Sequence, residues 1–419
     1  MTVRSHSVEV HPDFTLAFVE FDDQGRFWNR DQIDLVERTL RTENERADSS
    51  GVSVVVFAHG WRHGCDVCDE NVACFRTFLK QVRSDSVATS RVSAGRVRPK
   101  RIVAIYTGWR GRSAKIQPLE DLSFWARKQV ARRIAEGDFI ELLTRVEVFV
   151  RRANQTDPER VRLAVIGHSF GGTIVYASLA NILKARVLEA RNASAGGDRV
   201  IRGYGDLIVL INPAFEASLY APLNELAAGF GAFSPLQPPV LLTIASETDR
   251  PNRVWFPLGR YLETLFQNMG DRSPRAAANT AVGNYSEFWT HRLTAAVPPS
   301  AGARRDSFGS SSKNCACQLP LDPIDDREAA TLVALLSGEG TQAPTPGEAA
   351  APYGRALLTC LKPIGQGNPF WVVRASGDVM HGHSGIFTTY LVDFIRRVFI
   401  EANARSHPRR QVAAQPGVR

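Results

Sequence analysis

Five apolar segments recur along the chain, and longer mixed stretches separate them. Each holds a nearly continuous run of Val, Ile, Leu and Ala, as in VSVVVFAHG at residues 52–60, and the others begin at residues 101, 161, 206 and 239. Such runs are typical of strands that are covered on both faces of a parallel sheet. The stretches between them are long enough for crossover helices. The pattern therefore predicts an α/β fold, with a mostly parallel central sheet and helices on both faces.

Segments near both ends of the chain add elements to this sheet. Residues 15–29 predict a strand and a turn, which would form an antiparallel edge with a first strand near Val8. A helix is predicted over residues 29–43, where apolar residues recur near helical spacing. Toward the other end, residues 369–376 predict a last strand and residues 384–402 a closing amphipathic helix.

Composition divides the chain into four parts. Residues 1–295 predict the first part of the α/β core. Residues 296–360 are rich in Pro, Gly, Ser and Ala, so we expect a flexible insertion that could act as a lid, interrupted by a short helix near 326–338. Residues 361–402 complete the core with the last strand and the closing helix. Residues 403–419 form a basic tail that we expect to be disordered.

Charge and hydropathy narrow the possible partners. The chain has 419 residues and a formal net charge of +8, but its basic residues are scattered and form no nucleic-acid-binding module. We therefore expect no nucleic-acid partner. The N-terminal segment lacks the pattern of a signal peptide, and no stretch of about 18 apolar residues follows it. We expect a cytoplasmic protein without stable membrane insertion, and nothing in the pattern indicates an oligomeric state.

The cysteines raise the question of a metal site. They are Cys65, Cys68, Cys74, Cys315, Cys317 and Cys360. His63 and the first three cysteines could supply four soft ligands to zinc, but their spacing does not match a paired CxxC framework. The chain is also far longer than a disulfide-stapled secreted domain. We therefore expect mostly free thiols and no bound metal.

A serine between glycines follows the third of the five apolar segments. The residues Gly167, His168, Ser169, Phe170 and Gly171 fit the pattern G-x-S-x-G, with an apolar strand before them and a helix after them. A sharp turn from strand to helix leaves little room for a β-carbon at either glycine, and it exposes the serine hydroxyl at the end of the sheet. The motif in this context predicts that Ser169 is a nucleophile.

With these motifs the chain resembles the α/β-hydrolase superfamily, in its serine esterase and lipase branch, over residues 14 to about 290 and again over 369–400. The HGW, GWRG and GHSFGG segments are similar to those of a group of uncharacterised bacterial and fungal hydrolases. The resemblance implies the α/β-hydrolase fold. It also implies an oxyanion hole formed by the backbone N–H groups of Trp61 and Phe170, with His59 as a structural residue of the loop rather than a proton carrier.

A serine nucleophile needs a base beside it and a carboxylate that orients the base. The resemblance implies the order serine, acid, histidine, with the acid after the seventh strand. Asp249 fits that position best, and Glu247 and Asp378 stay open as alternatives. The histidine is expected on the loop before the closing helix. His383 matches the run of Gly-His followed by small and apolar residues, and His381 is the alternative base.

These residues and the resemblance imply a serine hydrolase that cleaves carboxylic esters through an acyl-enzyme on Ser169. The substrate is expected to be a small-molecule or lipid ester, and no metal or organic cofactor is needed. An amidase or peptidase with the same triad and a non-catalytic interaction protein on a hydrolase fold are the alternatives. Trp109, Phe124 and Trp125 could line an acyl pocket or pack in the core, and the sequence favours neither.

Overall fold

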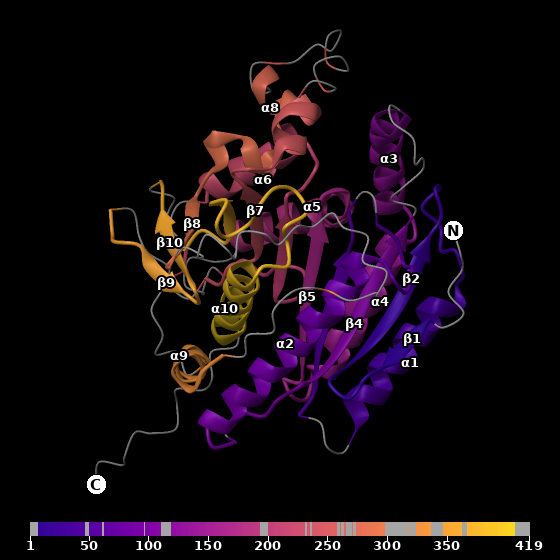
Figure 1. Cartoon of the computed structure of the whole chain (residues 1–419), viewed down its shortest axis with the longest axis vertical. Helices are drawn as coiled ribbons and strands as arrows, with labels where there is room; N and C mark the ends of the chain where they lie inside the picture. Colours follow the sequence, from indigo (N-terminus) through magenta and orange to yellow (C-terminus); the bar gives the residue numbers. More distant parts are fainter. Residues whose placement is uncertain are drawn as a thin grey trace.

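The computed structural model describes most of the chain. The described residues are 7–46, 50–60, 63–95, 97–109, 119–192, 200–230, 233–234, 237–257, 260, 264, 270, 274–297, 317, 324–336, 347–362 and 367–406, without the side chains of 119–125, 254–255, 336 and 403–406. In this part of the chain, strands form one large sheet with helices on both faces (Figure 1). The protein is therefore an α/β protein, as the sequence predicts.

The described strands join in one sheet with the order β1-β2-β4-β3-β5-β6-β7-β11-β8-β10-β9. They are β1 (Val8–Val10), β2 (Phe14–Phe21), β3 (Val52–Ala58), β4 (Arg101–Trp109), β5 (Val161–His168), β6 (Leu207–Ile211), β7 (Leu241–Ser246), β8 (His291–Ala295), β9 (Ala351–Tyr353), β10 (Ala356–Cys360) and β11 (Phe370–Ala375). All neighbours from β2 to β8 pair in parallel. The pairs at the two edges are antiparallel. They are β1 with β2 at one edge, and β8 with β10 and β10 with β9 at the other.

The five apolar segments form β3 to β7, and the predicted last strand forms β11 between β7 and β8. The antiparallel edge near Val8 is also confirmed, since Val8 pairs with Ala17. The apolar pattern of the sequence does not predict β8, β9 and β10. These strands are short and lie beside Pro- and Gly-rich stretches, so their apolar pattern is weak.

The helices cover both faces of the sheet. They are α1 (Asp31–Glu45), α2 (Glu70–Val92), α3 (Leu119–Glu136), α4 (Phe139–Ala153), α5 (Phe170–Asn192), α6 (Ala217–Ala228), α8 (Arg275–Asn279), α9 (Asp326–Leu336) and α10 (Thr389–Ser406), with a π-helical turn at Pro251–Trp255. Buried residues of α1, α3, α4, α5 and α6 pack in one core cluster, and those of α2 and α10 pack in a second. α9 packs on α2 and α10 from outside (Figure 1).

Strand β3 shows why the apolar runs have no polar alternation. Val54 and Val56 belong to the first core cluster, whereas Val55 and Phe57 belong to the second. Successive side chains of a strand point to opposite faces of the sheet. Both faces of β3 are therefore buried, and every position along it is apolar except Ser53.

Part of the predicted insertion, residues 296–360, is described. The expected short helix is present as α9, and β9 and β10 extend the sheet beyond β8. Most other residues of the insertion, and with them the expected lid, lie outside the described residues. The closing helix α10 ends at Ser406, four residues later than predicted, and residues 407–419 of the tail also lie outside the described part.

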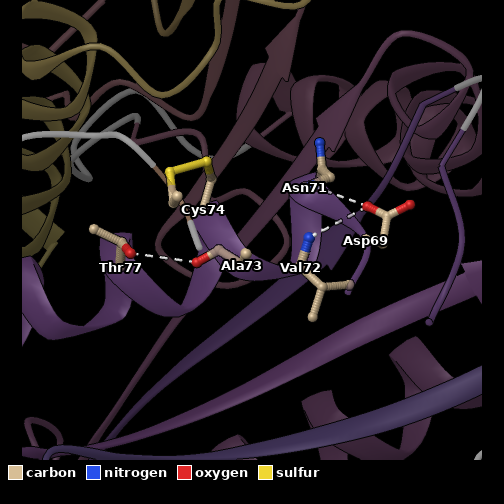
Figure 2. The surroundings of a disulfide bond; sticks show 7 residues. Asp69, Asn71, Val72, Ala73, Cys74 and Thr77 are labelled. Carbon is tan, nitrogen blue, oxygen red and sulfur yellow. Dashed lines mark hydrogen bonds between the residues drawn. A yellow bond between two sulfur atoms is a disulfide. The ribbon is translucent and has the colours of Figure 1, made fainter. Parts of the chain in front are cut away.

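A disulfide bond joins α2 to the insertion. It links Cys74 to Cys317, which are 243 positions apart in the chain, with 4.8 Å between their Cα atoms (Figure 2). Cys68 is disulfide-bonded as well, whereas Cys65 and Cys360 form no disulfide bond. The expectation of mostly free thiols is wrong for Cys68, Cys74 and Cys317. Cysteine connectivity cannot be deduced from spacing, because the fold decides which cysteines meet.

The start of α2 is visible beside this disulfide. The Asp69 carboxylate accepts hydrogen bonds from the backbone N–H groups of Asn71 and Val72, which have no acceptor inside the helix (Figure 2). This cap fixes where α2 begins, directly after the HGW loop. Within the described residues, none of the helices combines the length and apolar character that crossing a bilayer requires.

Candidate active site

Ser169 stands on a sharp turn between β5 and α5. Its φ angle is 55°, a left-handed conformation that is rare for residues other than glycine. A β-carbon on Gly167 would lie 2.6 Å from the carbonyl oxygen of Gly171, and one on Gly171 would lie 2.0 Å from the carbonyl oxygen of Ala58. Neither distance is sterically possible. The structure confirms the steric reason for glycine at both positions.

The serine is less accessible than its motif suggests. We expected an exposed hydroxyl at the end of the sheet, but Ser169 is only 1% exposed, so that expectation is wrong. The HGW loop passes directly over it, since a β-carbon on Gly60 would lie 2.8 Å from the β-carbon of Ser169. His383 bonds to its hydroxyl, and the rings of His168 and His383 are 5.2 Å apart.

Ser169, His383 and Asp249 form one hydrogen-bonded series. The Oγ atom of Ser169 lies 2.8 Å from Nε2 of His383. On the other side of the ring, Nδ1 of His383 lies 3.0 Å from each carboxylate oxygen of Asp249. An ionised carboxylate only accepts hydrogen bonds, so Nδ1 carries the proton and Nε2 is free to accept one from the serine. Asp249 is fully buried, whereas the side chain of His383 is 18% exposed.

The alternative residues have other surroundings. The side chain of His381 is exposed and makes no hydrogen bond within the described part of the chain. The carboxylate of Glu247 pairs with Arg292, at 3.1 Å from its Nε atom. Asp378 is exposed in the turn after β11. The structure thus brings Asp249 and His383 to Ser169, and it gives Glu247 a different partner.

The backbone carbonyl of His383 is held by two side chains. It accepts hydrogen bonds from Nδ2 of Asn212 at 2.8 Å and from Nε2 of His168 at 3.0 Å. Burial and the nearby His383 ring lower the pKa of His168 well below its ordinary value, so its ring is neutral. Because Nε2 donates, Nδ1 is the unprotonated nitrogen, and it has no partner in the described part. These contacts fix the position of the loop that carries His383.

Asn252 holds the carboxylate of Asp249. Its backbone N–H donates to Oδ1 at 3.1 Å, and its side-chain Nδ2 donates to Oδ2 at 2.9 Å. The same Nδ2 also donates to the backbone carbonyl of Asn212 at 2.9 Å. Asn212 has a φ angle of 44°, and its Oδ1 accepts from the N–H of Ser246 at the end of β7. One network therefore positions both the histidine and the acid.

Asn212 and Asn252 are not among the site residues that the sequence predicts. Asn212 follows β6 directly, on the same edge of the sheet as Ser169, because the carboxyl ends of parallel strands lie together. A polar side chain at that edge is a signal that could have singled it out. Asn252 has no such signal, since it lies in the π-helical turn after Asp249.

His59 is a structural residue of the loop. It is fully buried, and burial lowers its pKa to about 4, so the ring is neutral. Its Nε2 accepts from the backbone N–H of Trp109 at 3.1 Å, and its Nδ1 therefore donates to the Gly60 carbonyl at 2.7 Å. Both ring nitrogens are thus occupied, which agrees with the role expected from the resemblance.

Of the two residues expected to form an oxyanion hole, the structure describes Phe170 but not Trp61. Phe170 is buried and is the first residue of α5, directly after Ser169. Trp61 lies outside the described residues. Trp109, a candidate for an acyl pocket, is 1% exposed and stacks on His59 with 5.6 Å between ring centroids, so it packs in the core. The side chains of Phe124 and Trp125 are not described.

The disulfide bonds contradict the zinc site considered for His63, Cys65, Cys68 and Cys74. Cys68 and Cys74 are both disulfide-bonded, so neither offers a thiolate. His63 lies beside Asp69, with 3.2 Å from its Nδ1 to a carboxylate oxygen. In the part of the chain that the structure describes, no group of three or more His, Cys, Asp and Glu residues is placed to hold a metal ion.

Comparison of the chain with models of protein families, with curated proteins and with solved structures finds no match in any of the three.

Proposed function

We propose that this protein is a serine hydrolase of the α/β-hydrolase fold, which cleaves carboxylic esters through an acyl-enzyme on Ser169. The observation that carries the proposal is the series from Ser169 Oγ to His383 Nε2 and from His383 Nδ1 to Asp249. A serine activated by a histidine, with a carboxylate orienting the histidine, is the arrangement that nucleophilic catalysis by a hydroxyl needs.

In the first half of the reaction, Ser169 Oγ attacks the carbonyl carbon while its proton moves to Nε2 of His383. Asp249 keeps the Nδ1 proton in place and stabilises the imidazolium. The tetrahedral intermediate then collapses, the bond to the alcohol oxygen breaks, and Nε2 gives its proton to that oxygen. A water molecule repeats these steps on the acyl-enzyme. It gives its proton to Nε2 as it attacks, and the acid leaves as Ser169 takes that proton back.

The turn at Ser169 supports stabilisation of the intermediate. Phe170 opens α5, and the N-terminus of a helix favours negative charge. Gly60 closely approaches Ser169, and this supports the second oxyanion donor that the resemblance implies in the HGW loop, the N–H of Trp61. Preorganised donors of this kind typically contribute about 10²–10³ in rate each.

The order of elements also supports the proposal. The HGW loop follows β3, Ser169 follows β5, Asp249 follows β7, and His383 lies between β11 and α10. These are the positions that the resemblance implies for the loop, nucleophile, acid and base, and the chain order of serine, acid and histidine is that of the superfamily. A non-catalytic protein on the same fold would have no need to keep all three side chains hydrogen-bonded to one another.

A fluorophosphonate probe and a series of 4-nitrophenyl esters from acetate to palmitate test the proposal. We expect the probe to label Ser169 and at least one ester to be turned over. The variant Ser169→Ala should stay folded, since the described contact of its hydroxyl is with His383, and should lose on the order of 10⁶ in turnover.

Two results would change this assignment. Ester turnover that persists in folded Ser169→Ala, or an unlabelled serine in an inactive wild-type protein, would end it. Faster turnover of an anilide than of its matched ester would move the protein to the amidases, with the same three residues in the same roles.

A further inference from the structure

The loop that carries His383 is held from the carboxyl ends of β6 and β7. In the loop after β7, Thr248 Oγ1 accepts a hydrogen bond from the backbone N–H of Gly382 at 2.7 Å. Directly after β6, Nδ2 of Asn212 donates to the backbone carbonyls of Gly382 and His383, at 3.2 and 2.8 Å. Asn212 is therefore bonded to the backbone of the residue whose ring bonds to Ser169.

The orientation of the Asn212 amide follows from a further bond. The backbone N–H of Ser246 lies 2.9 Å from the side-chain oxygen of Asn212, and an N–H group can only donate. The acceptor is therefore Oδ1, and the NH₂ group faces the carbonyl of His383. Asn212 is 0% exposed, so a substrate cannot reach this amide. Any effect of the amide on a reaction must act through the residues to which it bonds.

The backbone of Asn212 is linked to the acid of the proposed triad. Its carbonyl accepts from Nδ2 of Asn252 at 2.9 Å, and the same Nδ2 donates to Oδ2 of Asp249 at 2.9 Å. The N–H of Asn212 donates to the carbonyl of Ile244 in β7 at 2.8 Å. One residue is thus linked to the base by its side chain and to the acid by its backbone.

The φ angle of Asn212, 44°, supports a functional role. This left-handed conformation is unfavourable for most residues other than glycine, and Asn and Asp tolerate it best. Strained conformations persist where the surroundings fix them, and they cluster at active sites. Within the described residues, positive φ angles outside glycine occur at Ala94, Ser169 and Asn212, and two of these three belong to the candidate active site.

We propose that Asn212 is a positioning residue of the hydrolytic reaction, which holds the ring of His383 in line with Ser169 Oγ. Its backbone link to Asn252 keeps the acid in reach of the same ring. The inference rests on the proposed function for the reaction itself. A displacement of about 1 Å at a reacting group costs about 10² in rate, even when the substituted residue touches no substrate. His168 also donates to the carbonyl of His383, so part of the activity should remain without Asn212.

Replacing Asn212 by glycine is the first test. Asn212→Gly removes the amide and suits the left-handed backbone. On the 4-nitrophenyl ester that the wild type cleaves fastest, we expect kcat to fall about 10²-fold and KM to stay within about threefold, because the amide is out of reach of the substrate. A kcat within about threefold of the wild type in the folded variant, or a change in KM alone, would overturn the proposal.

Asn154→Gly is the matched control. Asn154 also holds a strand by its amide, since Oδ1 accepts from the N–H of Val161 at 2.7 Å and Nδ2 donates to the carbonyl of Val161 at 2.9 Å. Val161 begins β5, at the edge of the sheet opposite to Ser169. This variant should lower the melting temperature and keep kcat within about twofold of the wild type. An equal loss of kcat in both variants would reduce the effect of Asn212 to stability and overturn the proposal.

A second variant, Asn212→Asp, keeps the shape of the side chain and the acceptor for Ser246. Its ionised carboxylate cannot donate to His383, whereas the acid form can. Relative to the wild type, kcat should be about 10²-fold lower where the carboxylate is ionised and should recover as the pH falls and the group is protonated. The titratable groups linked to this position by the bonds above are His168, Asp249 and His383, and comparison with the wild type at each pH removes the titration that both proteins share. A kcat equal to that of the wild type at every pH up to about 10 would overturn the proposal.

Nuclear magnetic resonance needs no turnover and separates this inference from the proposed function. In the Ser169→Ala protein with isotope-labelled histidine, the Nδ1–H group of His383 should give a resonance that is protected from exchange with water, because it bonds to the buried Asp249. Its absence in His383→Ala identifies it. Adding Asn212→Gly should speed the exchange by about tenfold or more, and adding Asn154→Gly should not. An unchanged rate with Asn212→Gly would overturn the proposal.

The two proposals fail in different ways. If no ester is cleaved and the fluorophosphonate probe leaves Ser169 unlabelled, the proposed function fails, and the role of Asn212 in a reaction fails with it. Faster exchange in Asn212→Gly would then leave Asn212 as an anchor of the loop alone, and unchanged exchange would remove that role too.

Discussion

The Nε2 atom of His383 lies 2.8 Å from the Oγ atom of Ser169, although the two residues are 214 positions apart in the chain. The contact exists because β5 and β11 belong to the parallel part of one sheet, whose strands end at the same edge. The backbone of each partner is also anchored. The N–H of Ser169 donates to Ile211, and the carbonyl of His383 accepts from Asn212.

Replacing each of the two histidines by alanine distinguishes the proposed base from its neighbour. His383→Ala should reduce turnover of 4-nitrophenyl acetate by several powers of ten, because no other described group is in hydrogen-bond contact with Ser169 Oγ. His381→Ala should cost about tenfold or less, since its ring is exposed and bonds to nothing described. Steady-state kinetics of both variants on this neutral ester decides the matter. An inactive His381→Ala beside an active His383→Ala would show the assignment to be wrong.

The acid can be tested in the same way. Asp249→Asn should keep the fold and lower turnover by about 10⁴, because an amide in that position favours the wrong tautomer of His383. Glu247→Gln breaks the ion pair with Arg292 on the surface and should reduce turnover of the neutral ester far less. The two rates are measured at one pH on proteins shown to be folded. A reversed order of the effects would move the role to Glu247.

The disulfide between α2 and the insertion should contribute to stability. Cys74→Ser combined with Cys68→Ser is expected to lower the free energy of unfolding by about 2–5 kcal/mol, since removal of both disulfide bonds frees a long loop in the unfolded chain. Cys360→Ser, which changes a free and half-buried thiol, is the control and should change it by less than about 1 kcal/mol. Urea denaturation under non-reducing conditions measures both. Equal stability of the variant without Cys68 and Cys74 and of the wild type would contradict this expectation.

Buried histidines should make stability depend on pH. Burial lowers the pKa of His291 to about 4, from an ordinary value of 6.5. Between these values the unfolded chain binds a proton that the folded protein does not, so stability is complete above about pH 6.5 and falls as the pH drops toward 4. A shift of this size corresponds to about 3 kcal/mol.

The variant His291→Gln removes this contribution. The free energy of unfolding, measured by denaturation at pH 7 and at pH 4, should fall by about 3 kcal/mol less in the variant than in the wild type. The absolute stability at pH 7 is expected to drop, because the ring packs against Trp371, but that effect is present at both pH values. The same pH dependence in both proteins would show that His291 titrates normally.

The cysteines bear on location. Disulfides are kept in oxidising compartments and are rare in the cytosol. The cytoplasmic location expected from the sequence stays a prediction. The disulfide bonds at Cys74 and Cys68 argue against it. Mass spectrometry of alkylated protein from its native host, without reduction, would establish whether Cys74 and Cys317 are paired there.

The sequence by itself determined the elements whose signal is local. The runs at β3 to β7 and β11 predict strands, because a strand buried on both faces has to be apolar at nearly every position. The sequence also predicts the sharp turn at Ser169, since only glycine fits at Gly167 and Gly171. The prediction that Ser169 is the nucleophile rests on the same local sterics.

Only the tertiary structure decided which distant groups meet. Two histidines and three carboxylates were consistent with the sequence, and the sheet selects His383 and Asp249 for contact with each other. The same holds for Asn212 and Asn252, for the bond between Cys74 and Cys317, and for β9 and β10 at the edge of the sheet. Each depends on where separate strands end and on how the loops after them are anchored, and local periodicity carries no information about contacts between residues that far apart in the chain.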